Sequence, residues 1–159
     1  MGYPTIFPTG TLRYDKEKAW NGYTLFPSSR GALLIDMDGN EVQRWAGLGG
    51  FPNKLLPGGY VLGTSGTRNS KYAFQDQLDL IQVDWDGNIV WKFDRTELVA
   101  DPGKEPQWQA RQHHDFQREG SSTGYYAPGA EPCVDGGKTL ILTHENLYNH
   151  ELTDKLLID

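Results

Sequence analysis

The stretch LLIDMDGNEVQRW at residues 33–45 returns in the same chain as IQVDWDGNIVWKF at residues 81–93. The two copies align without a gap at a spacing of 48 residues (81 − 33 = 48), and both place Asp-x-Asp-Gly-Asn between apolar segments. Asp-Gly between two apolar runs is the strongest short-range signal for a β-hairpin, because glycine adopts the positive φ angles that such turns need. Each copy therefore predicts an apolar strand, a tight turn and a second strand that ends in an aromatic residue.

A second strand–turn–strand unit follows each hairpin. The first is KLLPGGYVLG at 54–63, and the second is DGGKTLILTHE at 135–145, after a longer insertion. Four strands per unit at a period in the forties are typical of propeller blades, since a single four-stranded sheet cannot cover both of its own faces. The sequence therefore predicts an all-β fold of two four-stranded blades and the start of a third.

The repeats also divide the chain. We expect one partial propeller domain with four parts: an N-terminal segment at 1–30, a first blade at 31–75, a second blade at 76–145 and the start of the next blade at 146–159. The tail KLLID at 155–159 repeats the LLID of 33–36, so the chain is expected to end within a strand. A closed propeller needs roughly four to eight blades. We therefore expect a companion chain that completes the propeller, a homo-oligomer, or a longer parent chain.

The composition excludes several classes of partner. The chain has 159 residues and a formal net charge of −6, so it offers no basic surface for nucleic acid or an anionic membrane. Its 19 glycines, 9 prolines and mean hydropathy of −0.61 suit short strands and tight turns. Cys133 is the single cysteine, which excludes an internal disulfide. With neither a secretory signal pattern nor a membrane-length apolar run, we expect a soluble protein, cytoplasmic as written or periplasmic if a signal was removed.

The remaining segments predict little regular structure. Residues 14–20 and 149–157 could each form at most a helical turn or two. The polar stretch 94–109 and the Gly-, Ser- and Pro-rich stretch 118–137 are expected to be loops. The Asp-x-Asp-Gly-Asn motif evokes a calcium loop, but its glycine comes two residues too early and no glutamate stands at the required distance, so we interpret it as a turn.

The candidate site centres on His113 and His114, which precede Asp115 in the stretch QHHDFQR. Adjacent residues on a strand point to opposite faces, so only one of the two imidazoles is expected to face the propeller channel. That imidazole could act as an acid, a base or a hydrogen-bond donor, while a structural histidine bonded to Asp115 or to backbone remains an alternative. Arg118 could bind an anionic group through its planar guanidinium, or form an ordinary surface ion pair.

A second polar cluster contains His144, Glu145 and His150. Two histidines and a carboxylate could ligate zinc or iron, with His113 or His114 added, but their six-residue gap does not match a helical metal motif. We predict no metal and no cofactor, and keep a metal-dependent enzyme on a propeller scaffold as an alternative.

Several segments together resemble the front of the bacterial arylsulfotransferase family, whose members do not use a nucleotide sulfate donor. They are FPTGTLRYDKEKAWNGYTLFP at 7–27, the two hairpin motifs, KLLPGGYVLG, and HHDFQ at 113–117. The similarity extends over essentially all 159 residues, although the family's chains are two to three times longer. His-His-Asp after the second hairpin is its most specific element.

The resemblance implies a six-bladed propeller and a ping-pong reaction, in which a histidine takes a sulfuryl group from an aryl sulfate and passes it to a phenol. By this resemblance His114 or His113 would bind the sulfuryl oxygens. Arg118, from its own chemistry, is a further candidate for the wall of an anion-binding channel. The family's nucleophilic histidine and key arginine belong to later blades, outside this sequence. We therefore expect an arylsulfotransferase-like enzyme part that supplies supporting residues.

Substrate contacts are expected from His144, Tyr125 and Tyr126. Aromatic rings can stack on a phenolic substrate. Trp85, Trp91 and Trp108 are further candidates, although strand packing explains most of them. A non-catalytic alternative remains, in which the propeller is a binding or assembly module whose histidines are structural and whose open edge pairs with another chain.

Overall fold

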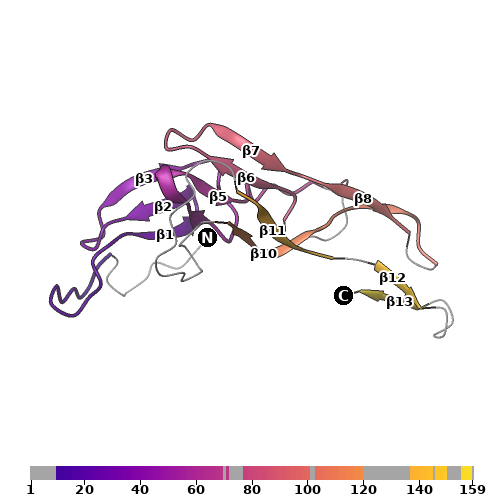
Figure 1. Cartoon of the computed structure of the whole chain (residues 1–159), viewed down its shortest axis with the longest axis horizontal. Coiled ribbons are helices and arrows are strands. Elements are labelled where there is room, and N and C mark those ends of the chain that lie inside the picture. The colour runs from indigo at the N-terminus through magenta and orange to yellow at the C-terminus, as the bar shows by residue number, and fades with distance from the viewer. Residues whose placement is uncertain are drawn as a thin grey trace, which may run out of the picture.

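The computed structural model is all-β and consists of several small antiparallel sheets (Figure 1). It describes residues 10–69, 71, 77–100, 103–119, 137–144, 146–149 and 155–158. Within these ranges there is no α-helix, and the one helical element is the short 3₁₀ turn η1 (Pro57–Gly59). In the same part of the chain, no helix has the length and apolar character needed to cross a membrane.

Three of the sheets form the body of the molecule. The first sheet has the order β1-β2-β3, the second sheet β4-β5-β6-β7, and the third sheet β10-β11. Their strands are β1 (Thr24–Ser28), β2 (Gly31–Ile35), β3 (Glu41–Trp45), β4 (Lys54–Leu55), β5 (Val61–Gly63), β6 (Leu80–Val83), β7 (Ile89–Phe93), β10 (Gln112–Arg118) and β11 (Thr139–Thr143).

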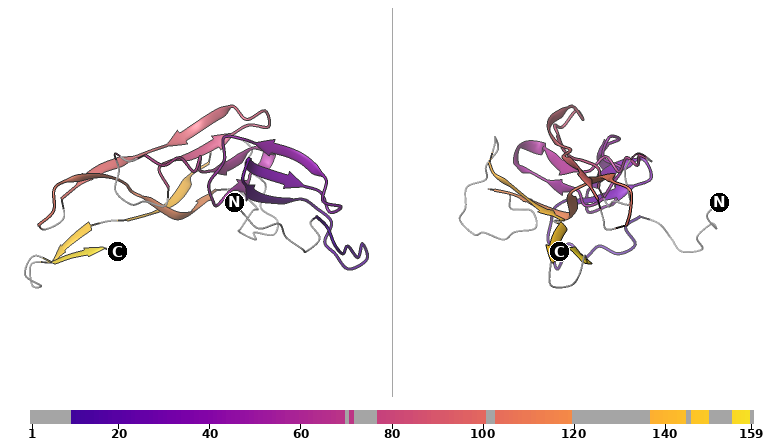
Figure 2. Two further views of the ribbon diagram at one scale, coloured as in Figure 1. Left: turned by 180° about the vertical axis from the view of Figure 1, so that it is seen from behind. Right: turned by 90° about the vertical axis from the view of Figure 1, so that its right-hand side faces the viewer.

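Two further hairpins extend from this body. They consist of β8 (Thr96–Val99) with β9 (Gln107–Ala110), and of β12 (Asn146–Asn149) with β13 (Lys155–Ile158). Figure 1 shows β1, β2 and β3 at one end of the molecule and β12 and β13 at the other. Seen from behind in Figure 2, the hairpin of β8 and β9 runs away from the first sheet.

Both hairpins predicted from the repeat are confirmed, as β2–β3 and β6–β7, and their turns are built alike. The Asp36 carboxylate accepts hydrogen bonds from the backbone N–H and the side-chain amide of Asn40, at 2.8 and 2.9 Å. The Asp84 carboxylate accepts the two equivalent hydrogen bonds from Asn88, at 2.8 and 2.9 Å. The glycines of the two turns, Gly39 and Gly87, have φ of 87° and 89°, a conformation in which a residue with a Cβ would be strained. The motif is therefore a turn, as the sequence predicts.

The second sheet takes strands from both sides of the expected blade boundary between residues 75 and 76. Its strands β4 and β5 come from the unit before that boundary, and β6 and β7 come from the second hairpin. The register Val61↔Val83 joins the two halves. The strand–turn–strand unit at 54–63 therefore pairs with the hairpin that follows it, because β5 lies against β6.

The first and second sheets pack face to face. Their shared core contains the buried residues Ala32, Leu34, Trp45, Leu48, Val61, Ile81 and Val83. Trp45 also donates from its indole Nε1 to the Asp84 carbonyl at 2.9 Å, which ties the first hairpin to the second turn. We call the side of a sheet that meets the following sheet its front face, and the opposite side its back face.

The third sheet covers the front face of the second sheet. Leu56, Leu62, Leu80 and Phe116 form this second core, with Tyr60, Trp91, Phe93 and Ile141 packed against it. The neighbours Val61 and Leu62 belong to different cores, and both are fully buried. Because successive side chains of a strand alternate between faces, the second sheet lies between the first and the third.

Two sequence-based expectations are wrong. Residues 94–109, expected to be a polar loop, contain β8 and most of β9, where Leu98 pairs with Trp108 across the hairpin. Residues 155–157, expected to be part of a helical turn, lie in β13, which agrees with the strand expected from the repeat of LLID in this stretch. In both cases strand pairing decides the conformation, since local propensity is a weak prior.

Replacing Leu62 with alanine tests the two-faced burial of the second sheet. Leu62 has no exposed surface, so the Leu62→Ala variant should lose about 2–5 kcal/mol of unfolding free energy in urea denaturation. The matched control is Leu98→Ala on β8, where the side chain is 53% exposed, and it should cost less than about 1 kcal/mol. Equal losses at the two positions would contradict the described packing.

The repeated turn makes a prediction about pKa values. Hydrogen bonds, first of all from the side chain of Asn40, lower the pKa of Asp36 below 3.8, and Asn88 does the same for Asp84. Because the folded-state pKa is lowered, each carboxylate stabilises the fold above the unfolded pKa, and this stabilisation is lost as the pH falls through the folded value. In carboxyl NMR titrations, Asn40→Ala should raise the pKa of Asp36 and leave that of Asp84 lowered. Asn88→Ala should do the reverse, and an unchanged Asp36 in Asn40→Ala would contradict the turn geometry.

Candidate functional site

The histidine pair lies in a bulge of β10. The register pairs Gln112 with Thr143 and Phe116 with Ile141, so four residue steps on β10 (116 − 112 = 4) oppose two on β11 (143 − 141 = 2). His114 sits in this bulge with φ of 53°, and among the described residues it is the one non-glycine with positive φ. Such a conformation is uncommon for a residue with a Cβ, and local strain of this kind is concentrated at functional sites.

The bulge brings three imidazole rings together. The rings of His113 and His114 have centroids 3.9 Å apart with planes at 63°, and the rings of His113 and His144 have centroids 4.0 Å apart at 43°. The expectation that neighbouring histidines point to opposite faces is therefore wrong, because the positive φ at His114 interrupts strand alternation. We call these three residues the histidine cluster.

Backbone contacts hold the cluster in place from both sides. The buried side chain of Gln77 donates from Nε2 to the His114 carbonyl at 3.1 Å and to the Phe51 carbonyl at 3.1 Å. The backbone N–H of His144 donates to the Arg111 carbonyl at 2.9 Å, just beyond the end of β11. Gln77 was not singled out in the sequence, because a glutamine far from the motif carries no local signal.

Asp115 is held by a lysine of the second sheet. Lys54 Nζ lies 2.6 Å from Asp115 Oδ1 and 2.5 Å from the Phe116 carbonyl. The hydrogen bond from Lys54 is the main reason that the pKa of Asp115 is lowered. Asp115 therefore carries a negative charge beside the histidine cluster at neutral pH and anchors the bulge to β4.

Arg118 lies on the back face of the third sheet, against the second sheet. It is 8% exposed, its Nε donates to Thr139 Oγ1 at 2.6 Å, and its guanidinium lies 5.2 Å from the centroid of Trp91. Such a cation–π contact adds to the packing of the two sheets. These contacts support packing rather than an exposed anion site at Arg118.

The expected aromatic residues have packing roles where they are described. Trp85 meets Trp45 edge to face at 5.5 Å, Trp91 lies in the second core, and Trp108 pairs with Leu98. Tyr125, Tyr126, Cys133, Glu145 and His150 lie outside the described residues.

Gln112 is a second site residue that the sequence analysis missed. It is 1% exposed and directly precedes His113, and neither its Nε2 nor its Oε1 has a hydrogen-bond partner within the described part of the chain. An unpaired buried amide costs free energy, roughly 1–3 kcal/mol. Within the described residues, the buried amide of Gln112, next to His113 in the chain, therefore has hydrogen-bonding capacity that no partner uses.

The cluster can act as a group of hydrogen-bond donors. A neutral imidazole has one N–H, and an imidazolium has two. Several such donors close together suit the oxygens of an anion. Among the described residues, no three His, Cys, Asp or Glu side chains are placed to hold one metal ion.

Comparison with known proteins does not assign the chain to a family. No family model, no curated protein and no solved structure matches it. The resemblance to arylsulfotransferases therefore rests on the sequence motifs alone.

The positive φ at His114 predicts that glycine destabilises the fold less than alanine at this position. Glycine adopts positive φ without a Cβ penalty, so His114→Gly should be more stable than His114→Ala by about 1 kcal/mol in denaturant unfolding. At His144, whose φ is not positive, glycine should be the less stable replacement by roughly 0.5–1 kcal/mol. The same order at both positions would show that the bulge does not form in solution.

Proposed function

We propose that the chain forms consecutive blades of a β-propeller and is part of an arylsulfotransferase-like enzyme. It would help to transfer a sulfuryl group from an aryl sulfate to a phenolic acceptor. The observation that carries the proposal is the contact among His113, His114 and His144, produced by the bulge of β10. The same motif, His-His-Asp, carries the resemblance to the arylsulfotransferase family.

The stacking of the sheets supports the propeller architecture. Each of the first two sheets packs its front face on the back face of the next, in the order of the chain. Successive blades of a propeller pack in this way because each four-stranded sheet has two faces to cover. The bulge then places the histidine cluster on the third of these sheets.

The proposed role of the cluster is to bind the sulfuryl oxygens. In the transfer, a nucleophilic histidine forms an N–S bond while the S–O bond to the aryl group breaks and the aryloxide leaves. The oxygen of the phenol then bonds to sulfur as its proton passes to a base, and the N–S bond breaks. Donors aimed at the sulfuryl oxygens stabilise the charge that they carry. The nucleophile itself is expected from later blades.

A second candidate function is a binding or assembly module without catalysis. The apolar side chains Leu140 and Leu142 on the front face of the third sheet favour it, since they are 73% and 55% exposed. In this case the histidine cluster would have a structural role only.

Titration with p-nitrophenyl sulfate separates the two candidates. The histidine NMR signals of the whole chain should shift in a saturable way, and His113→Ala or His144→Ala should weaken binding about tenfold, because each removes a hydrogen bond to a charged group. Lys92→Ala, which removes an exposed cation from β7, should leave the affinity unchanged.

Adding phenol to the same samples tests for transfer through the release of p-nitrophenolate. Absence of binding in the wild type would reject the enzymatic proposal and favour the assembly module. Binding without turnover agrees with a chain that contributes supporting residues.

A further inference from the structure

A pocket lies beside the turn of the first repeat, and no residue of the histidine cluster lines it. Its volume is about 460 Å³, which is within the range of roughly 300–1,000 Å³ that small-molecule sites occupy. One wall is the turn at 36–38, and the other wall is the segment at 14–23. This segment belongs to the stretch 7–27 that contributes to the resemblance to arylsulfotransferases, and the proposed sulfuryl transfer gives it no role.

The N-terminal segment lies directly on the turn. Thr11 Oγ1 donates to the Met37 carbonyl at 3.3 Å, and a Cβ built on Gly39 would lie 2.8 Å from the same hydroxyl oxygen. Farther along the segment, the backbone N–H of Ala19 donates to the Asp15 carbonyl at 2.8 Å, which closes a turn between the two parts that line the pocket. Figure 1 shows this segment, in indigo, beside the hairpin of β2 and β3.

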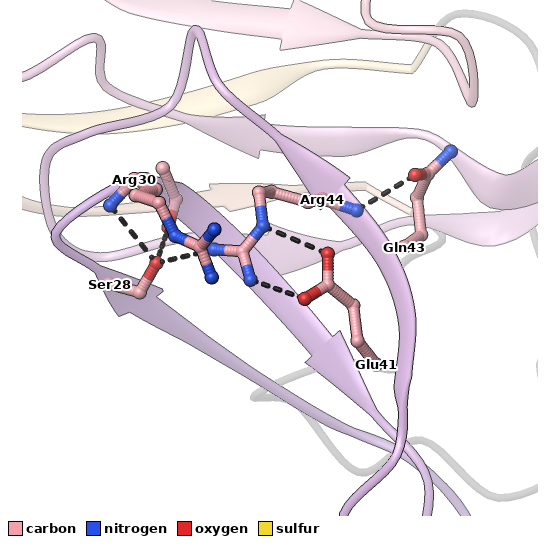
Figure 3. Close-up of polar contacts among 6 residues, drawn as sticks. Ser28, Arg30, Glu41, Gln43 and Arg44 are labelled. Atoms are coloured by element: carbon pink, nitrogen blue, oxygen red, sulfur yellow. Dashed lines mark hydrogen bonds and ion pairs between the residues drawn. The ribbon is translucent and has the colours of Figure 1, made fainter.

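Cross-strand contacts brace the hairpin that carries the turn. Figure 3 shows the Arg44 guanidinium of β3 directed at the Glu41 carboxylate and at the Ser28 hydroxyl of β1. Arg44 Nε lies 2.9 Å from Glu41 Oε1, and Arg44 Nη1 lies 3.0 Å from Ser28 Oγ. These bonds join the outer strands of the first sheet across β2. The wall formed by the turn is therefore held in place before a ligand binds, which lowers the entropy cost of binding.

Residues with aromatic rings and residues with hydrogen-bonding side chains line the same pocket. The segment contributes Tyr14, Asn21 and Tyr23, and Tyr23 is 65% exposed. The turn contributes Asp36 and Asp38, and the Asp38 side chain is exposed as well. Carboxylates accept hydrogen bonds, whereas amides and phenols both donate and accept them. The pocket therefore offers an aromatic surface next to several acceptors and donors.

The charges of the lining residues favour a neutral ligand. Two carboxylates against the ammonium of Lys16 give a net charge of −1 (1 − 2 = −1), which disfavours an anion. The hydrogen bond from the side chain of Asn40 is the main reason that the pKa of Asp36 is lowered, so this carboxylate is charged at neutral pH. Lys16 Nζ lies 5.5 Å from the centroid of the Tyr14 ring, so a positive charge already occupies the position that an organic cation would take there.

We propose that this pocket binds a neutral carbohydrate of one or two sugar rings. The C–H face of a pyranose is apolar and packs on an aromatic ring such as that of Tyr23. Its hydroxyl groups donate to a carboxylate such as Asp38 and accept from an amide such as Asn21. An aliphatic ligand would instead leave the carboxylates without partners. The site is independent of the proposed sulfuryl transfer.

The second repeat provides a matched comparison inside the same chain. The offset of 48 aligns Asp38 with Asp86, and both side chains are exposed. A Cβ built on Gly39 meets Thr11, whereas one built on Gly87 meets no atom within 4 Å. The described part of the chain therefore covers the first turn at this glycine and leaves the second turn open. Asp86→Asn removes the same charge as Asp38→Asn without changing the pocket.

Two-dimensional NMR of the whole isotope-labelled chain with neutral sugars tests the proposal. The panel consists of glucose, galactose, mannose, N-acetylglucosamine, maltose, cellobiose and lactose at millimolar concentration. At least one of these sugars should shift the backbone signals of residues 14–23 and 36–38 in a saturable way. Choline chloride and sodium sulfate, as an organic cation and an anion, should leave these signals unchanged.

Three variants identify the groups that bind the sugar. Tyr23→Ala removes a stacking face and Asp38→Asn removes a hydrogen bond to a charged group, so each should weaken binding about tenfold. Asp86→Asn should leave the affinity unchanged. All three replaced side chains are exposed, so the circular dichroism spectra should match that of the wild type.

Two results would overturn the proposal. The first is the absence of a saturable shift with every sugar of the panel, including the case in which choline or sulfate shifts the signals instead. The second is an equal loss of affinity in Asp38→Asn and Asp86→Asn. Neither result bears on the histidine cluster, because His113→Ala should bind the sugar as tightly as the wild type while its binding of p-nitrophenyl sulfate is weakened.

Discussion

The structure depends on the burial of both faces of the second sheet. Val61 and Leu62 are neighbours in β5, both are fully buried, and they belong to different cores. Successive side chains of a strand point to opposite faces of the sheet. Two consecutive buried apolar residues therefore require packing against both faces of that sheet. The first and third sheets supply the two covers, so the central sheet determines where its neighbours lie.

The histidine cluster exists because one strand departs from this alternation. With regular geometry, His113 and His114 would point to opposite faces of the third sheet. The positive φ at His114 and the extra residues of β10 bring these two rings together instead, and the ring of His113 also lies against that of His144. Gln77 and the pair formed by Lys54 and Asp115 hold this bulge from elements far away in the chain. The second sheet therefore supports the candidate site as well as the core.

An exposed apolar face and the histidine cluster belong to the same third sheet. Its back face is packed by Phe116 and Arg118, while its front face exposes Leu140 and Leu142. Covering the front face would exclude water from one side of the sheet that carries the cluster, which strengthens electrostatic interactions with an anion.

The sequence by itself determined the two hairpins and the all-β class. Their Asp-Gly-Asn turns depend on bonds between Asp36 and Asn40, and between Asp84 and Asn88, four residues apart in each case, so they can be read from a short stretch. Only the tertiary structure decided which strands share a sheet, where β8 and β9 form, and how the histidines meet. These features depend on pairings between residues far apart in the chain. The bulge at His114 is the clearest case, because the contacts that hold it come from Gln77 and Lys54, which no local pattern connects to it.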